Sequence, residues 1–282
     1  MFKSIREYDL YHMSVGDGVP VVAIHGFGID HHVMFYSHEP VFRQRKGYRR
    51  IYFDLPGMGR SRGGMPANSD AMLQVVQDFI DSVIPGEDFL LTGASYGAYL
   101  ARGIVHRWPK RVLGLMMPVP LIEAERRKRT LPPRTIIKRD QEFLESLQRE
   151  DREEFVSTAT VQDETVWKRY KKAVMPGVRA VDQGCLAEFQ AKGYSFSFDV
   201  DDMQEPFPAP TLMLMGRQDT AVGFIDSLRI VENFPRGSVV ILDRASHALE
   251  VEQYALFNAL MSEWLDRVEE WVGARRPPGE NI

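Results

Sequence analysis

The sequence is poor in cysteine and lacks long apolar runs, and each shortage excludes a class of protein. Cys185 is the one cysteine among 282 residues, which rules out an intramolecular disulfide and fits a reducing compartment. No uninterrupted apolar stretch is long enough to span a membrane, and the N-terminus lacks the apolar core of a signal peptide. We therefore expect a cytoplasmic protein with no membrane partner.

An excess of basic charge is also missing. The formal net charge is −4 and the pI is about 6.0, whereas nucleic-acid binding calls for clustered Lys and Arg. The basic run at residues 126–129 is local, and an acidic stretch soon follows it. We interpret this region as a solvated helical face of mixed charge and expect no nucleic-acid partner.

The chain does contain an alternation of short apolar segments with helical patterns. Strands are predicted at residues 19–24, 50–54, 88–92, 112–117, 211–215 and 238–242. Helical spacing appears at residues 70–84, 98–105, 224–234 and 250–271. This order predicts an α/β fold in which helices cover both faces of a mostly parallel sheet.

The character of the sequence changes between about residues 119 and 206. Strand patterns vanish there, charge rises, and amphipathic helical patterns are broken only at Pro-containing segments. We interpret residues 119–206 as a helical insertion, called the inserted segment below. Residues 1–118 and 207–282 then form the α/β core.

A glycine-flanked serine lies between a predicted strand and a predicted helix. Gly93 and Gly97 lack Cβ atoms, so the start of the helix can pack closely against the end of the strand. Ser95 is then left exposed on a strained turn, with the next backbone N–H pointing at the same space. We predict that Ser95 is a nucleophile.

A serine hydroxyl needs a base to accept its proton and an acid to orient that base. Catalytic groups of such sheets gather at the carboxyl ends of the strands. His247 follows the last predicted strand and is the expected base, and Asp219 follows the preceding strand and is the expected acid. Asp243, close to His247 in sequence, and Glu123, after the strand that ends at residue 117, are rival acids.

The turn after the first buried strand could supply a donor for an oxyanion. We predict that the backbone N–H groups of Phe27 and Tyr96 form this oxyanion hole. His25 is expected to brace the loop through hydrogen bonds. The turn at residues 54–61 should border the same cleft as a rigid loop.

These motifs occur in the order seen in the α/β-hydrolase superfamily, which the chain resembles over nearly its whole length. They are the segments at residues 25–28, 54–61, 93–97 and 216–219, followed by His247. The resemblance implies Ser95 as nucleophile, His247 as base, Asp219 as acid, and Phe27 and Tyr96 as oxyanion donors. It also implies that the inserted segment is a helical cap that roofs the pocket. A serine at position 95 disfavours the haloalkane-dehalogenase and epoxide-hydrolase branches, which attack through a carboxylate.

Three other groups of residues contain side chains that can bind metal, react as a thiol or line a pocket. His31, His32 and His38 give no convincing metal site, because adjacent helical residues point about 100 degrees apart and no carboxylate recurs nearby at ligand spacing. Cys185 has no basic activator and is expected to be a buried or semi-buried thiol. Six aromatic residues could line an acyl pocket, although core packing is the more common role. They are Phe35, Tyr36, Phe189, Tyr194, Phe196 and Phe198.

The sequence thus favours a serine hydrolase that cleaves a small carboxylic ester through an acyl-enzyme, with a small molecule as its partner and no cofactor or metal. Ester cleavage leads because ester leaving groups demand least of the site. Amide, lactone, thioester or carbon–carbon bond hydrolysis and acyl transfer use the same parts and stay open. A non-catalytic ligand receptor, an interaction module that uses the charged insertion, and a homodimer also stay open.

Overall fold

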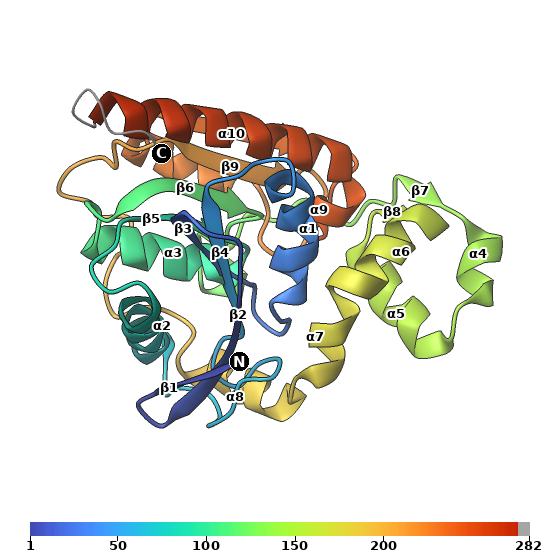
Figure 1. Ribbon diagram of the computed structural model, residues 1–282. Helices are drawn as coiled ribbons and strands as arrows, with labels where there is room; N and C mark the ends of the chain where they lie inside the picture. The colour runs from blue at the N-terminus through green and yellow to red at the C-terminus, as the bar shows by residue number, and fades with distance from the viewer. Residues whose placement is uncertain (276–282) are drawn as a thin grey trace.

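The computed structural model describes residues 1–275, and its centre is an eight-stranded sheet (Figure 1). The strand order is β1-β2-β4-β3-β5-β6-β9-β10. The strands are β1 (Phe2–Ile5), β2 (Tyr8–Val15), β3 (Val19–Ile24), β4 (Tyr48–Phe53), β5 (Phe89–Gly93), β6 (Val112–Pro118), β9 (Thr211–Gly216) and β10 (Gly237–Leu242). From β4 to β10 all neighbours pair in parallel, and only the β1–β2 and β2–β4 pairs are antiparallel. The predicted fold class is confirmed.

Helices cover both faces of this sheet. On one face α3 (Tyr96–Arg107) packs against β3, β5 and β6, and α2 (Ser69–Val83) packs beside it. On the other face α10 (Tyr254–Arg275) packs against β6 and β9 and contacts α1 (His32–Phe42). Every residue of β5 and β9 is buried, as expected for central strands covered on both sides. No described helix is long and apolar enough to cross a bilayer.

The inserted segment connects β6 to β9 and is mostly helical. Its elements are η1 (Arg126–Lys128), β7 (Lys138–Arg139), α4 (Gln141–Ser146), α5 (Arg149–Thr158), β8 (Val161–Gln162), α6 (Glu164–Ala173), α7 (Met175–Ala180) and α8 (Gln183–Lys192). Figure 1 shows α4, α5 and α6 projecting to one side of the sheet. The short parallel pair of β7 and β8 corrects the expectation that this segment has no strand.

Four features of the core were not predicted, and helix α1 is one of them, since no helix was expected at residues 32–42. Strands β1 and β2 were missed, since they are only partly buried and lack a continuous apolar run. The segment expected to be a helix at residues 224–234 forms a 3-10 helix, η2 (Asp226–Asn233). The terminal helix is divided into α9 (Leu249–Glu252) and α10 at Gln253, whose side chain donates to the carbonyl oxygens of Asp243 and Arg244.

Candidate active site

Ser95 lies on a strained turn between β5 and α3. Its backbone angles, φ 54° and ψ −116°, lie in a region that a non-glycine residue rarely adopts. An added Cβ atom at Gly93 would lie 2.3 Å from the carbonyl oxygen of Gly97, and one at Gly97 would lie 2.2 Å from that of Ile24. Both positions therefore require glycine, as expected from the sequence.

The structure brings Ser95, His247 and Asp219 together at the carboxyl ends of β5, β10 and β9. His247 Nε2 lies 3.0 Å from Ser95 Oγ, and His247 Nδ1 lies 2.8 Å from Asp219 Oδ2. Asp219 is fully buried, and its Oδ1 accepts hydrogen bonds from the N–H groups of Ala221 and Val222. These contacts fix the carboxylate that faces the imidazole.

The two rival acids lie elsewhere. Asp243 is exposed, and its Oδ1 accepts a hydrogen bond of 2.8 Å from the Gln218 side chain. Glu123 Oε1 accepts from the N–H of Glu125 at 2.9 Å. Neither carboxylate has a hydrogen bond to His247, so Asp219 is the acid that the geometry offers.

The charge of Asp219 also sets the protonation of His247. Burial lowers the pKa of His247, but the charge of Asp219 and its hydrogen bond outweigh burial and raise this pKa above the ordinary imidazole value. The imidazolium that forms when a serine is deprotonated is therefore stabilised.

The two residues predicted to form the oxyanion hole flank Ser95. Phe27 lines the cavity, and Tyr96 is the first residue of α3. Within residues 1–275 the N–H groups of Phe27 and Tyr96 donate no hydrogen bond to other protein groups. The Ser95 N–H donates instead to the carbonyl oxygen of Pro118 at 3.0 Å. The role of the two free amides stays a prediction.

His25 braces the loop that carries Phe27, in agreement with the interpretation from sequence. The N–H of Leu55 donates to His25 Nε2 at 2.9 Å, so the proton of the neutral imidazole lies on Nδ1. This Nδ1–H donates to the carbonyl oxygen of Gly26 at 2.7 Å. This pair of bonds ties the loop after β3 to the loop after β4, and the N–H of Gly28 reaches the sulfur of Met58.

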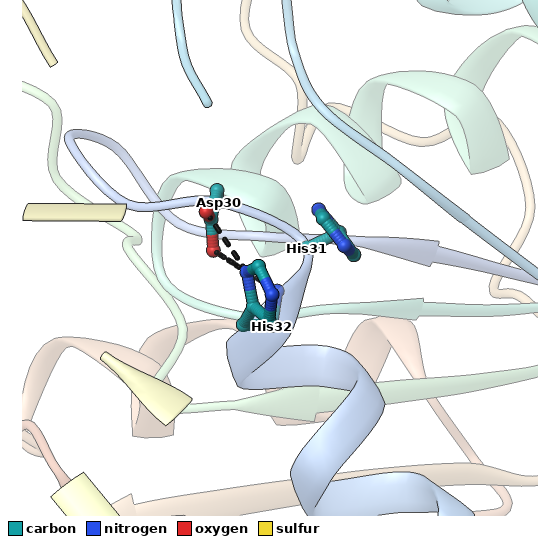
Figure 2. A group of neighbouring side chains, drawn as sticks. All are labelled: Asp30, His31 and His32. Carbon is teal, nitrogen blue, oxygen red and sulfur yellow. Dashed lines mark hydrogen bonds and ion pairs between the residues drawn. The ribbon is translucent and has the colours of Figure 1, made fainter. Parts of the chain in front are cut away.

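A carboxylate does lie beside His31 and His32, contrary to the expectation from sequence. Asp30, His31 and His32 place potential ligand atoms within 4.8 Å of one another, and Figure 2 shows the hydrogen bonds that the Asp30 carboxylate accepts from His32 Nδ1. His31 Nδ1 lies 2.7 Å from Asp54 Oδ1, so a carboxylate already occupies Nδ1 of each ring. The cluster is thus explained as bracing of the loop before α1. His38 lies apart from it, buried.

Beside Ser95 lies a cavity of about 360 Å³ that both apolar and polar residues line. Core residues supply Phe27, Ile29, Val33 and Ala248, among others. The inserted segment supplies Val119, Glu154, Thr158, Tyr170, Val174, Val178, Gln183, Leu186, Ala187 and Gln190. The inserted segment therefore forms much of the wall, in agreement with the implied roof over the pocket, while its division from the core stays a prediction.

The six aromatic residues weighed from the sequence do not line this cavity. Phe189 and Tyr194 pack against the rings of Phe27 and Tyr96 behind it. Phe35 and Tyr36 border a second cavity of about 330 Å³. Phe196 and Phe198 stack on each other beside α3. Packing is therefore the role of Phe189, Tyr194, Phe196 and Phe198, whereas Tyr36 is exposed. The lining of the cavity beside Ser95 includes the aromatic residues Phe27 and Tyr170.

Cys185 is exposed, so the expectation of a buried or semi-buried thiol was wrong. Helix α8 turns Leu186 and Phe189 inward and leaves the neighbouring Cys185 on the solvent side. The charge of Asp182, which caps α8, raises the pKa of the Cys185 thiol. The thiol is therefore not activated.

Sequence reasoning missed two buried carboxyl groups on α9. Glu252 Oε1 accepts from the N–H groups of Thr160 and Val161, and its Oε2 accepts from the N–H and hydroxyl of Ser246. Glu252 therefore ties the inserted segment to the residue before His247. Glu250 lines the cavity and is 6% exposed. The local sequence marks neither residue, because their burial depends on packing with the inserted segment.

The fold and the site together define an α/β hydrolase. A model of the alpha/beta hydrolase family matches residues 21–260, and the chain belongs to this family. The resemblance inferred from the motifs is thereby confirmed.

Among its relatives, the chain is 24% identical to the pimeloyl-[acyl-carrier protein] methyl ester esterase of Aeromonas hydrophila, over 92% of this chain and 97% of that protein. It is 25% identical to the 2-hydroxy-6-oxononadienedioate/2-hydroxy-6-oxononatrienedioate hydrolase of Burkholderia vietnamiensis, over 78% of this chain and 77% of that protein. A solved alpha/beta superfamily hydrolase from Oenococcus oeni is 27% identical with a TM-score of 0.86, over 95% of this chain and 99% of that chain. The family and these relatives support a hydrolase of ester type.

Proposed function

We propose that this protein cleaves a small carboxylic ester through an acyl-enzyme on Ser95. The observation that carries this proposal is the continuous contact from Ser95 Oγ to His247 Nε2 at 3.0 Å and from His247 Nδ1 to Asp219 Oδ2 at 2.8 Å. Such a chain of contacts can remove the serine proton during attack and store the resulting positive charge.

In the proposed cycle, Ser95 Oγ attacks the ester carbonyl carbon while His247 Nε2 takes the hydroxyl proton. The amides of Phe27 and Tyr96 donate to the oxyanion, and His247 then protonates the leaving alkoxide as the carbon–oxygen bond breaks. Water attacks the acyl-enzyme with His247 as base, and the acid product leaves as Ser95 regains its proton. Asp219 keeps the imidazole proton on Nδ1 throughout.

The relatives favour esters over the carbon–carbon bond alternative. The Aeromonas relative is named for a methyl ester, whereas the Burkholderia relative is named for dicarboxylates. Recognition of a dicarboxylate calls for a cation, and none of the described residues that line the cavity is Lys or Arg. Glu154 and Glu250 would repel such a substrate.

The test is turnover of p-nitrophenyl esters of graded acyl length, alongside the matching anilides and a set of lactones. We expect esters to react fastest, with a burst of p-nitrophenol and an acyl adduct on Ser95 by intact mass. Ser95→Ala should abolish both. Ester turnover that survives in Ser95→Ala, or anilides that outpace esters, would contradict the proposal.

A further inference from the structure

Glu250 is a buried carboxyl that the proposed cycle does not use. It lies shortly after His247 on α9, lines the cavity beside Ser95 and is 6% exposed. Within residues 1–275 its Oε2 has no hydrogen-bond partner. An isolated carboxylate in such a place is costly, and buried carboxylates are normally paired. Oε2 itself is shielded from solvent, so a ligand in the cavity meets the rest of this unpaired side chain.

A second carboxylate lies at the same end of the cavity. Glu154 of α5 lines it, and the Tyr170 hydroxyl donates to Glu154 Oε1 at 3.0 Å. Burial and the charge of Glu154 are the largest causes that raise the pKa of Tyr170. The charge of Glu250 raises this pKa further, so Glu250 also lies near Tyr170. We call Glu154, Tyr170 and Glu250 the acidic end of the cavity.

No cation of the described chain neutralises the acidic end. The lining of the cavity contains neither Lys nor Arg. Glu250 also borders the second cavity, whose lining includes Arg43, Arg169 and Lys172. None of these three cations forms an ion pair or hydrogen bond that would satisfy Glu250 Oε2. The acidic end therefore offers two carboxyl groups, and no Lys or Arg, to whatever enters beside Ser95.

We propose that the acidic end binds a protonated amine, so that the preferred esters carry an ammonium group and esters that carry a carboxylate are rejected. This inference rests on the proposed ester cleavage and adds the substrate class. An ammonium offers donors to the carboxyl groups of Glu250 and Glu154, and a cation also interacts favourably with the face of an aromatic ring such as Tyr170.

The protonation of Glu250 agrees with this assignment. Burial raises the pKa of Glu250 to about 7. The charge of His247 lowers this pKa, and the charges of Glu252 and Asp219 raise it by smaller amounts. A ligand cation would supply the positive charge that the protein withholds, and would favour the ionised carboxylate. A ligand carboxylate would instead face like charge.

Binding to Ser95→Ala tests the assignment without any catalysis. Hexylammonium, 1-hexanol and hexanoate have chains of equal length and differ in the charge of the head group. By calorimetry we expect hexylammonium to bind at least about tenfold more tightly than 1-hexanol, and hexanoate to bind most weakly. Adding Glu250→Gln should remove most of the preference for ammonium.

Two further variants make the test decisive. Glu164→Gln removes the same charge from α6 at a side chain that is 60% exposed, and should leave the preference unchanged. Glu154→Gln keeps an acceptor for Tyr170 and should weaken hexylammonium binding, even if Glu250→Gln folds poorly. Equal binding of hexylammonium and 1-hexanol, or a preference that survives both cavity variants, would overturn the inference. An intact ammonium preference without ester turnover would overturn the proposed function alone.

Discussion

The substitution Asp219→Asn tests the orientation of His247. The two N–H groups of Ala221 and Val222 donate to Asp219 Oδ1, so an asparagine would place its oxygen there and its NH₂ group against His247 Nδ1. His247 Nδ1 must then accept, which moves the ring proton to Nε2, opposite Ser95 Oγ. In that tautomer Nε2 cannot accept the serine proton.

The wrong tautomer should reduce kcat/KM by about 10³–10⁴, which corresponds to about 4–5.5 kcal/mol of transition-state stabilisation. The assay is steady-state ester hydrolysis over a range of pH, with the Tm measured to establish folding. Asp243→Asn and Glu123→Gln are matched controls, and both should stay near wild type. The reasoning would fail if Asp219→Asn kept near-normal turnover while either control lost it.

Three other predictions follow from the structure. Because Asp219 raises the pKa of His247, kcat/KM should fall as the pH drops through that raised pKa. The acid side of the pH profile of kcat/KM should therefore have its midpoint above about 6.5, and a midpoint below this value would refute the assignment. Gly97→Ala should lower the free energy of unfolding, measured by thermal melts, by at least about 1–3 kcal/mol. In the control Gly273→Ala the added Cβ atom meets no atom within 4 Å, so the free energy of unfolding should not fall. Equal melting temperatures of the two variants would contradict the packing argument. Glu252→Gln should lower the free energy of unfolding by about 1–3 kcal/mol, because the glutamine NH₂ group would face N–H donors where the carboxylate has an acceptor oxygen. The same substitution should lower kcat more than it changes KM. Unchanged stability would count against the bridging role of Glu252.

The central strands could be predicted because their sequences reflect burial on both faces. Strands β3, β5 and β9 are almost wholly buried, so each is a short apolar run. Strand β1, at the edge of the sheet, is mostly exposed, and β2 beside it alternates buried and partly exposed residues, so no apolar run marks either strand. The pair of β7 and β8 is too short to leave a pattern.

The residues that meet at the candidate site could be located because each directly follows a strand. Ser95, Asp219 and His247 are placed by the ends of β5, β9 and β10, and the sheet brings these ends together. Glu250 and Glu252 could not be located, since their stretch of α9 resembles a solvated helical turn until the inserted segment packs over it.

The inward spacing of Leu186 and Phe189 in α8 was a usable signal that its neighbour Cys185 faces solvent. The expectation of burial for Cys185 relied instead on the absence of a basic activator, which does not determine the exposure of a thiol.

The most direct test of the central claim is the intact mass of the protein after treatment with a small fluorophosphonate. The account predicts a single phosphonyl adduct on the wild-type chain and none on Ser95→Ala, because only a serine activated by His247 reacts readily. An adduct of the same yield on Ser95→Ala, or no adduct on the folded wild-type chain, would contradict an activated nucleophile at this position.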